Sequence, residues 1–167
     1  MKRQFSLLGN LKLAVAMMVL LFGVGQAQAQ GLPVKCPVDG KYYQIRFPDN
    51  FSDARSVAQN AFWEGRRGQL AVLARDDVRA WVFNEFRSRN PGFVFVGGQR
   101  EGNVATRGWY WFDNVNIRTP IAMGSNWAPG EPNNFAGRES VASLDFNQGG
   151  RLNDISPNGR YYFLVQY

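Results

Sequence analysis

The order of hydrophobic and polar residues predicts one strand and two helices in the first half of the chain. Residues 41–47 are rich in aromatic and β-branched side chains, and the Pro-Asp-Asn turn at 48–50 follows them, which indicates a strand. Apolar residues recur at helical spacing over 54–62, which predicts a first helix. A second amphipathic run begins near Asp76 and stops at the Asn-Pro-Gly turn at 90–92.

Capping and breaking residues suggest where these helices begin and end. Ser52 or Asp53 is the expected N-cap of the first helix, and Gly65 ends its pattern. The apolar face of the second helix consists of Val78, Trp81, Val82 and Phe86. Two helices are therefore expected early in the chain and close together.

The second half of the chain has the pattern of short strands separated by loops rich in Gly, Asn and Pro. The segments rich in aromatic or β-branched residues are 93–96, 109–111, 141–146 and 161–167. A long irregular stretch lies at 113–138, and such a stretch in a compact domain is usually functional or disordered. The pattern predicts an α+β fold, with two helices followed by short antiparallel strands and a long irregular loop region.

The start of the chain has the order of a secretory signal peptide. Basic residues precede an apolar run at 13–24, and a small-residue site that ends at Ala29 follows it. The run is shorter than the roughly 20 residues of a spanning helix, so no stable membrane insertion is expected. We expect a signal peptide at 1–29, a short linker at 30–38 and one domain at 39–167, in a secreted or periplasmic protein.

Composition excludes several kinds of chemistry. The net charge is +6, but three basic residues lie in the signal segment, and the remaining mild excess does not predict nucleic-acid binding. The chain has no histidine and one cysteine, which excludes His-based triads and disfavours zinc. That cysteine, Cys36, forms no disulfide within the chain, although from the linker it could join two copies into a homo-oligomer.

Five oxygen donors lie on either side of the strand expected at 141–146. They are Glu131, Asn133 and Glu139 before it, and Asn153 and Asp154 after it. Carboxylate and amide oxygens suit hard cations, and Ca²⁺ takes six to eight of them. The donors therefore indicate a calcium site with open positions, with the modest dissociation constant of about 10⁻⁴–10⁻³ M found in extracellular modules.

The motifs around these donors resemble those of the C-type lectin family, in a bacterial type without disulfides. The matching segments are Gly-Trp-Tyr-Trp-Phe-Asp at 108–113, Asn-Trp-Ala-Pro-Gly-Glu-Pro-Asn-Asn at 126–134, Glu139, and Asn-Asp-Ile-Ser at 153–156. Further matches upstream and at the closing strand extend the likeness over 39–167. The resemblance implies a C-type lectin-like fold and a lectin that binds carbohydrate through one Ca²⁺, held by Glu131, Asn133, Glu139, Asn153 and Asp154.

The resemblance also implies a class of sugar. In the family, the same carboxylates accept hydroxyl protons and the same amides donate to hydroxyl oxygens, which assigns sugar contacts to Glu131, Asn133, Glu139 and Asn153. The Glu-Pro-Asn order resembles that of binders of mannose, glucose, fucose and N-acetylglucosamine, and family members have a cis bond before the residue equivalent to Pro132. Phe135, in an otherwise polar stretch, is a candidate for stacking on a sugar ring.

The chain departs from the family pattern at its core cysteines. Their positions hold Trp63 and Val165 in one pair, and Val141 and Pro157 in the other. Because both members of each pair are replaced, we expect packing to substitute for the disulfides.

Other departures bear on the site itself. Leu152 stands where a tryptophan usually precedes the Asn-Asp pair, so the packing beneath the ion is expected to differ. Asn134 stands where members with a second ion have Asp, which predicts one ion. Trp109, Trp111 and Trp127 match core or loop-anchor positions of the family.

Two other functions remain open at this point. A C-type lectin-like adhesion or protein-interaction domain would have the same fold without binding sugar. An enzyme is disfavoured, since Glu131 and Glu139 could act as a glycosidase pair only if no metal occupied them. We therefore expect a partner that is a carbohydrate or glycoconjugate, and no catalysis.

Overall fold

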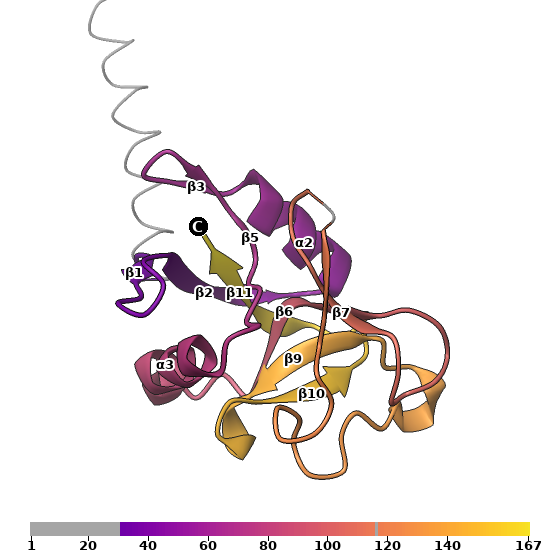
Figure 1. Cartoon of the computed structure of the whole chain (residues 1–167). Helices are drawn as coiled ribbons and strands as arrows, with labels where there is room; N and C mark the ends of the chain where they lie inside the picture. Colours follow the sequence, from indigo (N-terminus) through magenta and orange to yellow (C-terminus); the bar gives the residue numbers. More distant parts are fainter. Residues whose placement is uncertain (1–30, 116) are drawn as a thin grey trace, which may run out of the picture. The chain divides into compact units, whose positions relative to one another are not determined.

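A mixed β-sheet is the centre of the structure, a computed structural model that describes residues 31–115 and 117–167 (Figure 1). Within this part, nine strands form one sheet with the order β1-β2-β11-β6-β7-β8, while β5 pairs with β11, β9 with β6, and β10 with β9. The strands are β1 (Val34–Lys35), β2 (Tyr42–Asp49), β5 (Gln69–Leu70), β6 (Phe93–Arg100), β7 (Trp109–Phe112), β8 (Arg118–Pro120), β9 (Val141–Asp145), β10 (Arg151–Ile155) and β11 (Tyr161–Gln166). The signal peptide expected at 1–29 lies outside the described residues.

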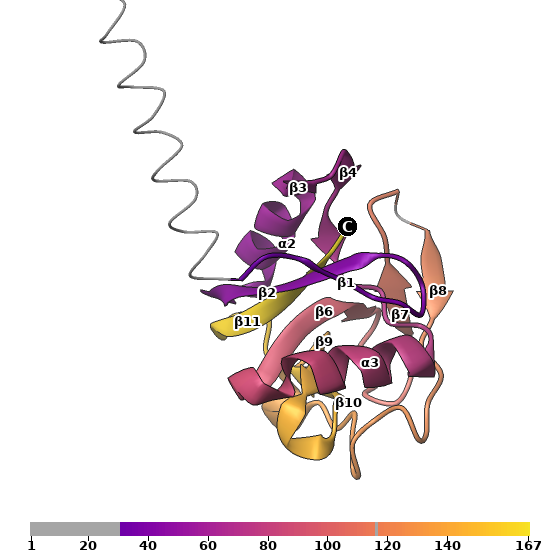
Figure 2. The ribbon, with the colours of Figure 1, turned by 90° about the vertical axis from the view of Figure 1, so that its left-hand side faces the viewer.

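Two α-helices lie on opposite sides of β2, β11 and β6, as the two views show (Figures 1 and 2). These helices are α2 (Phe51–Asn60) and α3 (Asp76–Phe86), the latter followed by a 3₁₀ turn at Arg87–Arg89. Neither described helix is long and apolar enough to cross a membrane. The α+β class expected from the sequence is confirmed.

Strand β6 separates two groups of buried side chains because its residues point alternately to the two faces of the sheet. Val94 and Val96 pack in the cluster that contains the apolar face of α3, whereas Phe95 packs in the cluster that contains Phe51 of α2. The Phe95 and Phe51 rings meet edge to face, with centroids 5.3 Å apart. The strand is therefore covered on both faces.

The first helix begins earlier and ends earlier than the sequence pattern predicts. Its N-cap is Asn50, whose Oδ1 accepts a hydrogen bond from the Asp53 backbone N–H at 3.0 Å. The helix ends at Asn60, and Phe62, assigned to the helix from its spacing, lies 64% exposed in β3 (Phe62–Trp63). That strand pairs with β4 (Arg66–Arg67) in a separate two-stranded hairpin, so the chain reverses where the helix was expected to finish.

Three short strands and β10 were not anticipated as strands of the sheet. The short ones, β1, β5 and β8, are two or three residues long, which gives too few positions for an alternating pattern. Strand β8 pairs antiparallel with β7 inside the stretch expected to be irregular. The strand pairs of the sheet are antiparallel, except that β11 runs parallel to β6. The local sequence does not reveal this relative direction.

The segment before β2 belongs to the folded domain. Strand β1, within the expected linker, pairs antiparallel with β2. Cys36 is 0% exposed and packs in the main core cluster, and burial raises the pKa of its thiol. The suggestion that Cys36 joins two copies is therefore wrong for the folded domain, because its sulfur faces the core.

Trp63 and Val165, which stand at one pair of the family's cysteine positions, lie at the same apolar cluster. Val165 is completely buried, and Trp63 is partly buried against the same cluster. Gly68 brings the backbone close to Val165, since a Cβ there would lie 2.6 Å from the Ala58 carbonyl oxygen and 3.0 Å from a Val165 methyl group. The packing around Val165 is therefore tight.

Candidate functional site

An anchor at Trp127 holds the long loop beside β10. The Trp127 and Trp109 rings pack with centroids 4.9 Å apart, and both side chains are buried. The backbone on each side of Trp127 bonds to Leu152: Ala128 N–H donates to Leu152 O at 2.8 Å, and Leu152 N–H donates to Asn126 O at 2.8 Å. Trp127 therefore fixes the start of the Glu-Pro-Asn loop, and Leu152 is wholly buried beneath it.

The Glu131–Pro132 peptide bond is cis, as the resemblance implies. Glu131 N–H donates to Ala128 O at 2.9 Å, which closes a turn before the proline. The side-chain amide of Asn133 donates to Glu131 Oε1 at 2.8 Å. The two residues that flank Pro132 thus have their side chains in direct contact.

Asp154 connects this loop to the sheet. It lies in β10, is 1% exposed, and its two carboxylate oxygens accept the backbone N–H groups of Asn133 at 2.9 Å and Asn134 at 2.8 Å. A carboxylate that accepts two backbone hydrogen bonds is held in one orientation. Asp154 therefore sets the position of the loop relative to β10.

Glu139 closes the other end of the loop. Its Oε2 accepts a hydrogen bond from Phe135 N–H at 2.8 Å, and its own N–H donates to Asn134 Oδ1 at 3.1 Å. Between them lies a 3₁₀ turn, Phe135–Gly137, that begins at Asn134 in the left-handed conformation. Phe135 is 75% exposed, so its ring faces solvent beside the site.

Burial and neighbouring carboxyl groups raise pKa values at the site. Burial, a contact with the Asp154 carboxyl and repulsion by Asp154 and Glu139 raise the pKa of Glu131 to about 7. Burial and repulsion by Asp154 also raise the pKa of Glu139. Glu131 Oε2 is buried and has no hydrogen-bond partner among the described residues. An unsatisfied oxygen in a group of mutually repelling carboxylates is stabilised by a positive ion.

Contacts join four of the five predicted ligands. Glu131, Asn133, Glu139 and Asp154 touch or influence one another through hydrogen bonds and charge. Asn153 precedes Asp154 in β10 and is half-buried, but no side-chain bond joins it to the others within the described part. Its backbone carbonyl accepts a bond from Ser143 Oγ at 3.2 Å.

The donor set fits Ca²⁺ only if amide oxygens take part. No group of three or more His, Cys, Asp or Glu side chains in the described ranges could hold a metal by itself. Both Asp154 oxygens already accept backbone hydrogen bonds, which leaves them fewer lone pairs to coordinate a metal, whereas Glu131 Oε2 has no such partner. Ca²⁺ accepts mixed carboxylate and amide ligands in flexible geometry, so the residues present suit it better than they suit Zn²⁺.

Two arginines that no local sequence pattern singled out bond to the loop. Arg79 of α3 donates to Asn126 Oδ1 at 3.1 Å, and Arg100 at the end of β6 donates to Glu139 O at 2.8 Å. An arginine in either element is usually a solvated side chain, so these contacts become visible only when segments distant in sequence are brought together.

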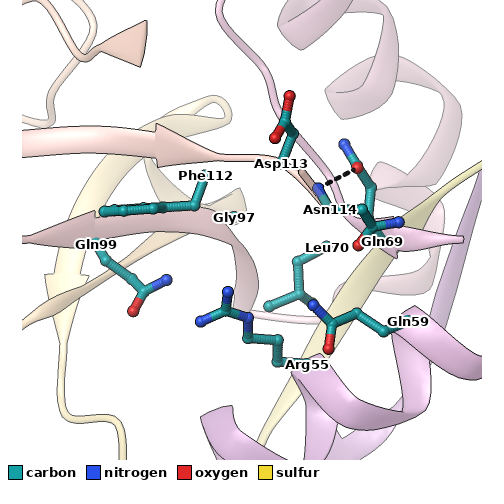
Figure 3. A pocket seen from close by; sticks show the side chains of 9 residues that line it. All are labelled: Arg55, Gln59, Gln69, Leu70, Gly97, Gln99, Phe112, Asp113 and Asn114. Carbon is teal, nitrogen blue, oxygen red and sulfur yellow. Dashed lines mark hydrogen bonds between the residues drawn. The ribbon is translucent and has the colours of Figure 1, made fainter. Parts of the chain in front are cut away.

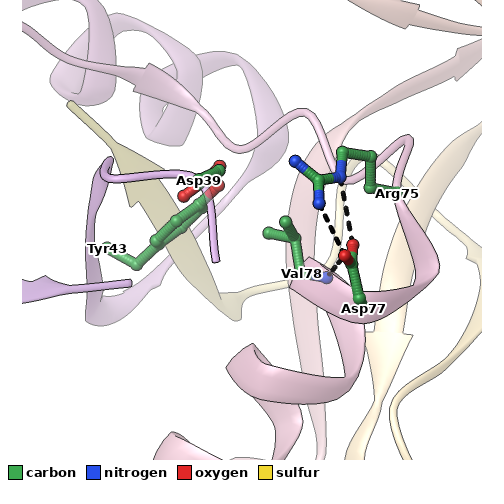
Figure 4. Close-up of polar contacts among 5 residues, drawn as sticks. All are labelled: Asp39, Tyr43, Arg75, Asp77 and Val78. Atoms are coloured by element: carbon green, nitrogen blue, oxygen red, sulfur yellow. Dashed lines mark hydrogen bonds and ion pairs between the residues drawn. The ribbon is translucent and has the colours of Figure 1, made fainter. Parts of the chain in front are cut away.

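Two hollows lie among other elements. One, between α2 and strands β5–β7, encloses about 10 Å³, room for about one water molecule, and Arg55, Gln59 and Gln99 line it (Figure 3). The other, of about 270 Å³, lies at the start of α3, where Arg75 forms a two-fold ion pair with Asp77 and Tyr43 donates to Asp39 (Figure 4). Neither includes a predicted site residue.

Comparison of the sequence with known proteins gives distant matches. No protein-family model matches the chain. It is 27% identical over 140 residues to halomucin of Haloquadratum walsbyi, a match that covers 77% of this chain and 1% of halomucin. It is 28% identical over 92 residues to eosinophil granule major basic protein 2 of Cavia porcellus, which covers 55% of this chain and 36% of that protein. The matches thus span a small part of each relative.

Solved structures establish the fold. The C-type lectin CEL-I from Cucumaria echinata superimposes with a TM-score of 0.62 at 19% identity, over 80% of this chain and 97% of CEL-I. The carbohydrate-recognition domain of the mouse scavenger receptor C-type lectin gives 0.57 at 21% identity, over 76% and 87%. TC14, a C-type lectin of the tunicate Polyandrocarpa misakiensis, gives 0.56 at 20% identity, over 75% and 97%. The chain has the C-type lectin-like fold, and these structural neighbours are lectins.

Proposed function

We propose that the domain is a calcium-dependent carbohydrate-binding module whose single Ca²⁺ would be held by Glu131, Asn133, Glu139, Asn153 and Asp154. The observation that supports this most directly is the buried Oε2 of Glu131, which has no partner among the described residues. It belongs to a carboxyl group that contacts Asp154 and has a pKa raised to about 7. A divalent cation would offset both the burial and the repulsion of these groups.

Side chains of the loop and of β10 would form hydrogen bonds with the sugar. The bound ion would supply a positive centre with open positions for hydroxyl oxygens. Glu131 and Glu139 would accept hydroxyl protons, while Asn133 and Asn153 would donate from their amides. This order of acids and amides favours mannose, glucose, fucose or N-acetylglucosamine as ligand. The exposed ring of Phe135 would cover one face of the sugar.

A second candidate is a C-type lectin-like adhesion or protein-interaction domain that binds no sugar. It is favoured by the two backbone hydrogen bonds to Asp154, which close the loop without a metal. The same fold serves different ligands, so only the chemistry of the site separates the two. In either case, the domain would act by binding rather than by catalysis.

We also propose that the protein is exported. The support is the order of basic, apolar and small residues in 1–29. N-terminal sequencing of the protein from its native cells should give Gln30 as the first residue. A chain that still starts at Met1 would contradict this proposal.

A glycan array with and without chelator tests the main proposal. The folded domain should bind mannose- or fucose-type glycans in millimolar Ca²⁺ and lose them in chelator, and Glu131→Gln should abolish binding. Glu101→Gln is the matched control, because Glu101 is exposed and forms an ion pair with Arg118, and no side-chain contact among the described residues joins it to a proposed ligand. Calcium binding with no glycan bound would favour the second candidate.

A further inference from the structure

Arg100 clamps two consecutive carbonyl groups next to the proposed calcium site. It is the last residue of β6, and its backbone N–H donates to Ser140 O at 2.9 Å. Its side-chain Nη2 donates to Glu139 O at 2.8 Å. One residue of the sheet therefore fixes the backbone just where the loop rejoins β9.

The contact reaches a residue that is bonded twice within the loop. The N–H and carboxylate of Glu139 bond to Asn134 and Phe135, which belong to the same loop. The bond from Arg100 instead ties Glu139 to a strand. Asp154 of β10 holds the loop at Asn133 and Asn134, and the contact from Arg100 adds a second attachment, to β6, at Glu139.

The remaining donors of Arg100 argue against a purely stabilising role. Its Nε and Nη1 are buried and have no acceptor among the described residues, while its guanidinium lies 5.9 Å from the centroid of the Trp109 ring. A buried donor without a partner lowers stability, so an apolar side chain would suit this place as well for stability. The bond to Glu139 O is the feature that an apolar side chain would lack.

We propose that Arg100 is a positioning residue for the calcium site, which holds the Glu139 backbone so that its carboxylate stays beside Asp154. This inference rests on the proposed function. The direction of the change in calcium affinity distinguishes a positioning role from a simple effect of charge. Removing a positive charge near a cation site should strengthen calcium binding, whereas losing a positioning contact should weaken it. Outer contacts of metal ligands commonly contribute about 10–100-fold to metal affinity.

Three variants test the proposal: Arg100→Met, Arg100→Lys and the control Arg138→Met. Arg138 is exposed, adjoins Glu139 and makes no side-chain hydrogen bond among the described residues, so its loss removes the same charge without the contact. Calorimetry should show calcium affinity about tenfold weaker for Arg100→Met, partly restored by Arg100→Lys, and unchanged or tighter for Arg138→Met.

Amide hydrogen exchange in the metal-free protein supplies a readout that does not depend on calcium. Arg100→Met should speed exchange at the amides of Phe135 and Glu139 about tenfold, with the thermal midpoint unchanged. If Arg100→Met does not fold, the exchange rates of Arg100→Lys are compared with those of the wild type instead. Unchanged exchange at these two amides would overturn the inference, as would calcium affinity equal to or tighter than that of the wild type. If the wild type binds no calcium, the proposed function fails alone and the exchange rates still decide the role of Arg100.

Discussion

Asp154 Oδ1 accepts the backbone N–H of Asn133 at 2.9 Å, a bond that joins two residues 21 positions apart in the chain. Through it, a buried strand residue determines where the Glu-Pro-Asn loop lies. The same carboxylate is a proposed calcium ligand. The fold of the loop and the charge of the site therefore depend on one side chain.

Asp154→Asn should lower both stability and calcium affinity. The amide offers one oxygen where the carboxylate offers two, and its NH₂ group would face the N–H of Asn133 or Asn134. A buried mismatch of this kind costs about 1–3 kcal/mol of unfolding free energy, measurable by urea denaturation in chelator. Asp53→Asn, at an exposed helix start, is the control and should change stability little. Equal stability of Asp154→Asn and the wild type would contradict the role of Asp154.

The metal-free domain should lose stability as the pH rises from about 4.5 to 7. The pKa of Glu131 is raised to about 7 in the folded protein from an ordinary value of 4.5, so the folded state binds more protons than the unfolded state over this interval. Glu139, whose pKa is also raised, acts in the same direction. Thermal unfolding in chelator at several pH values measures the slope, and Glu131→Gln should flatten it. A slope of opposite sign would exclude this account of Glu131.

Trp127→Ala should disconnect the loop from β10. A buried large aromatic residue contributes about 3–5 kcal/mol, and its loss also removes the contact with Trp109. Trp127→Phe should cost much less, because the indole Nε1 has no hydrogen-bond partner in the described part of the chain. Unfolding free energies compare the two, and calcium titration of Trp127→Phe should remain near the wild type. A larger loss from the Phe variant than from the Ala variant would refute the packing role.

Exchanging acid and amide around Pro132 should change the sugar that binds. Glu131→Gln with Asn133→Asp reverses the order of donors and acceptors while keeping one carboxylate in the pair. Glycan-array binding should shift toward galactose, with calcium binding retained. An unaltered preference would mean that sugar is not read by this loop.

The sequence predicted the parts of the fold that local patterns specify. The apolar face of α3 and its start at Asp76 were anticipated because the periodicity and the acidic first turn are both local signals. The N-cap Asn50 was missed because Ser52 and Asp53 offer the same chemistry two and three residues later. Strand β10 was missed because Asn153 and Asp154 read as loop residues, and they lie in a strand only through pairing with β9.

The candidate site was only partly predictable for the same reason. Spacing and resemblance selected the five proposed ligands, because they lie in short motifs that can be recognised in the sequence. The contact of Arg100 with Glu139 joins positions 39 residues apart, and the Trp127 anchor depends on Trp109 and Leu152. No local pattern encodes such contacts, since they arise from the topology of the sheet.

Calcium titration of the wild type and of Glu131→Gln by calorimetry tests the central claim most directly. The wild type should bind one ion with a dissociation constant of about 10⁻⁴–10⁻³ M, as extracellular calcium modules do. Glu131→Gln, which removes the carboxylate with the buried unpartnered oxygen, should weaken binding at least about tenfold while the domain stays folded. Absence of binding by the wild type at millimolar calcium, or equal binding by the two proteins, would contradict the claim.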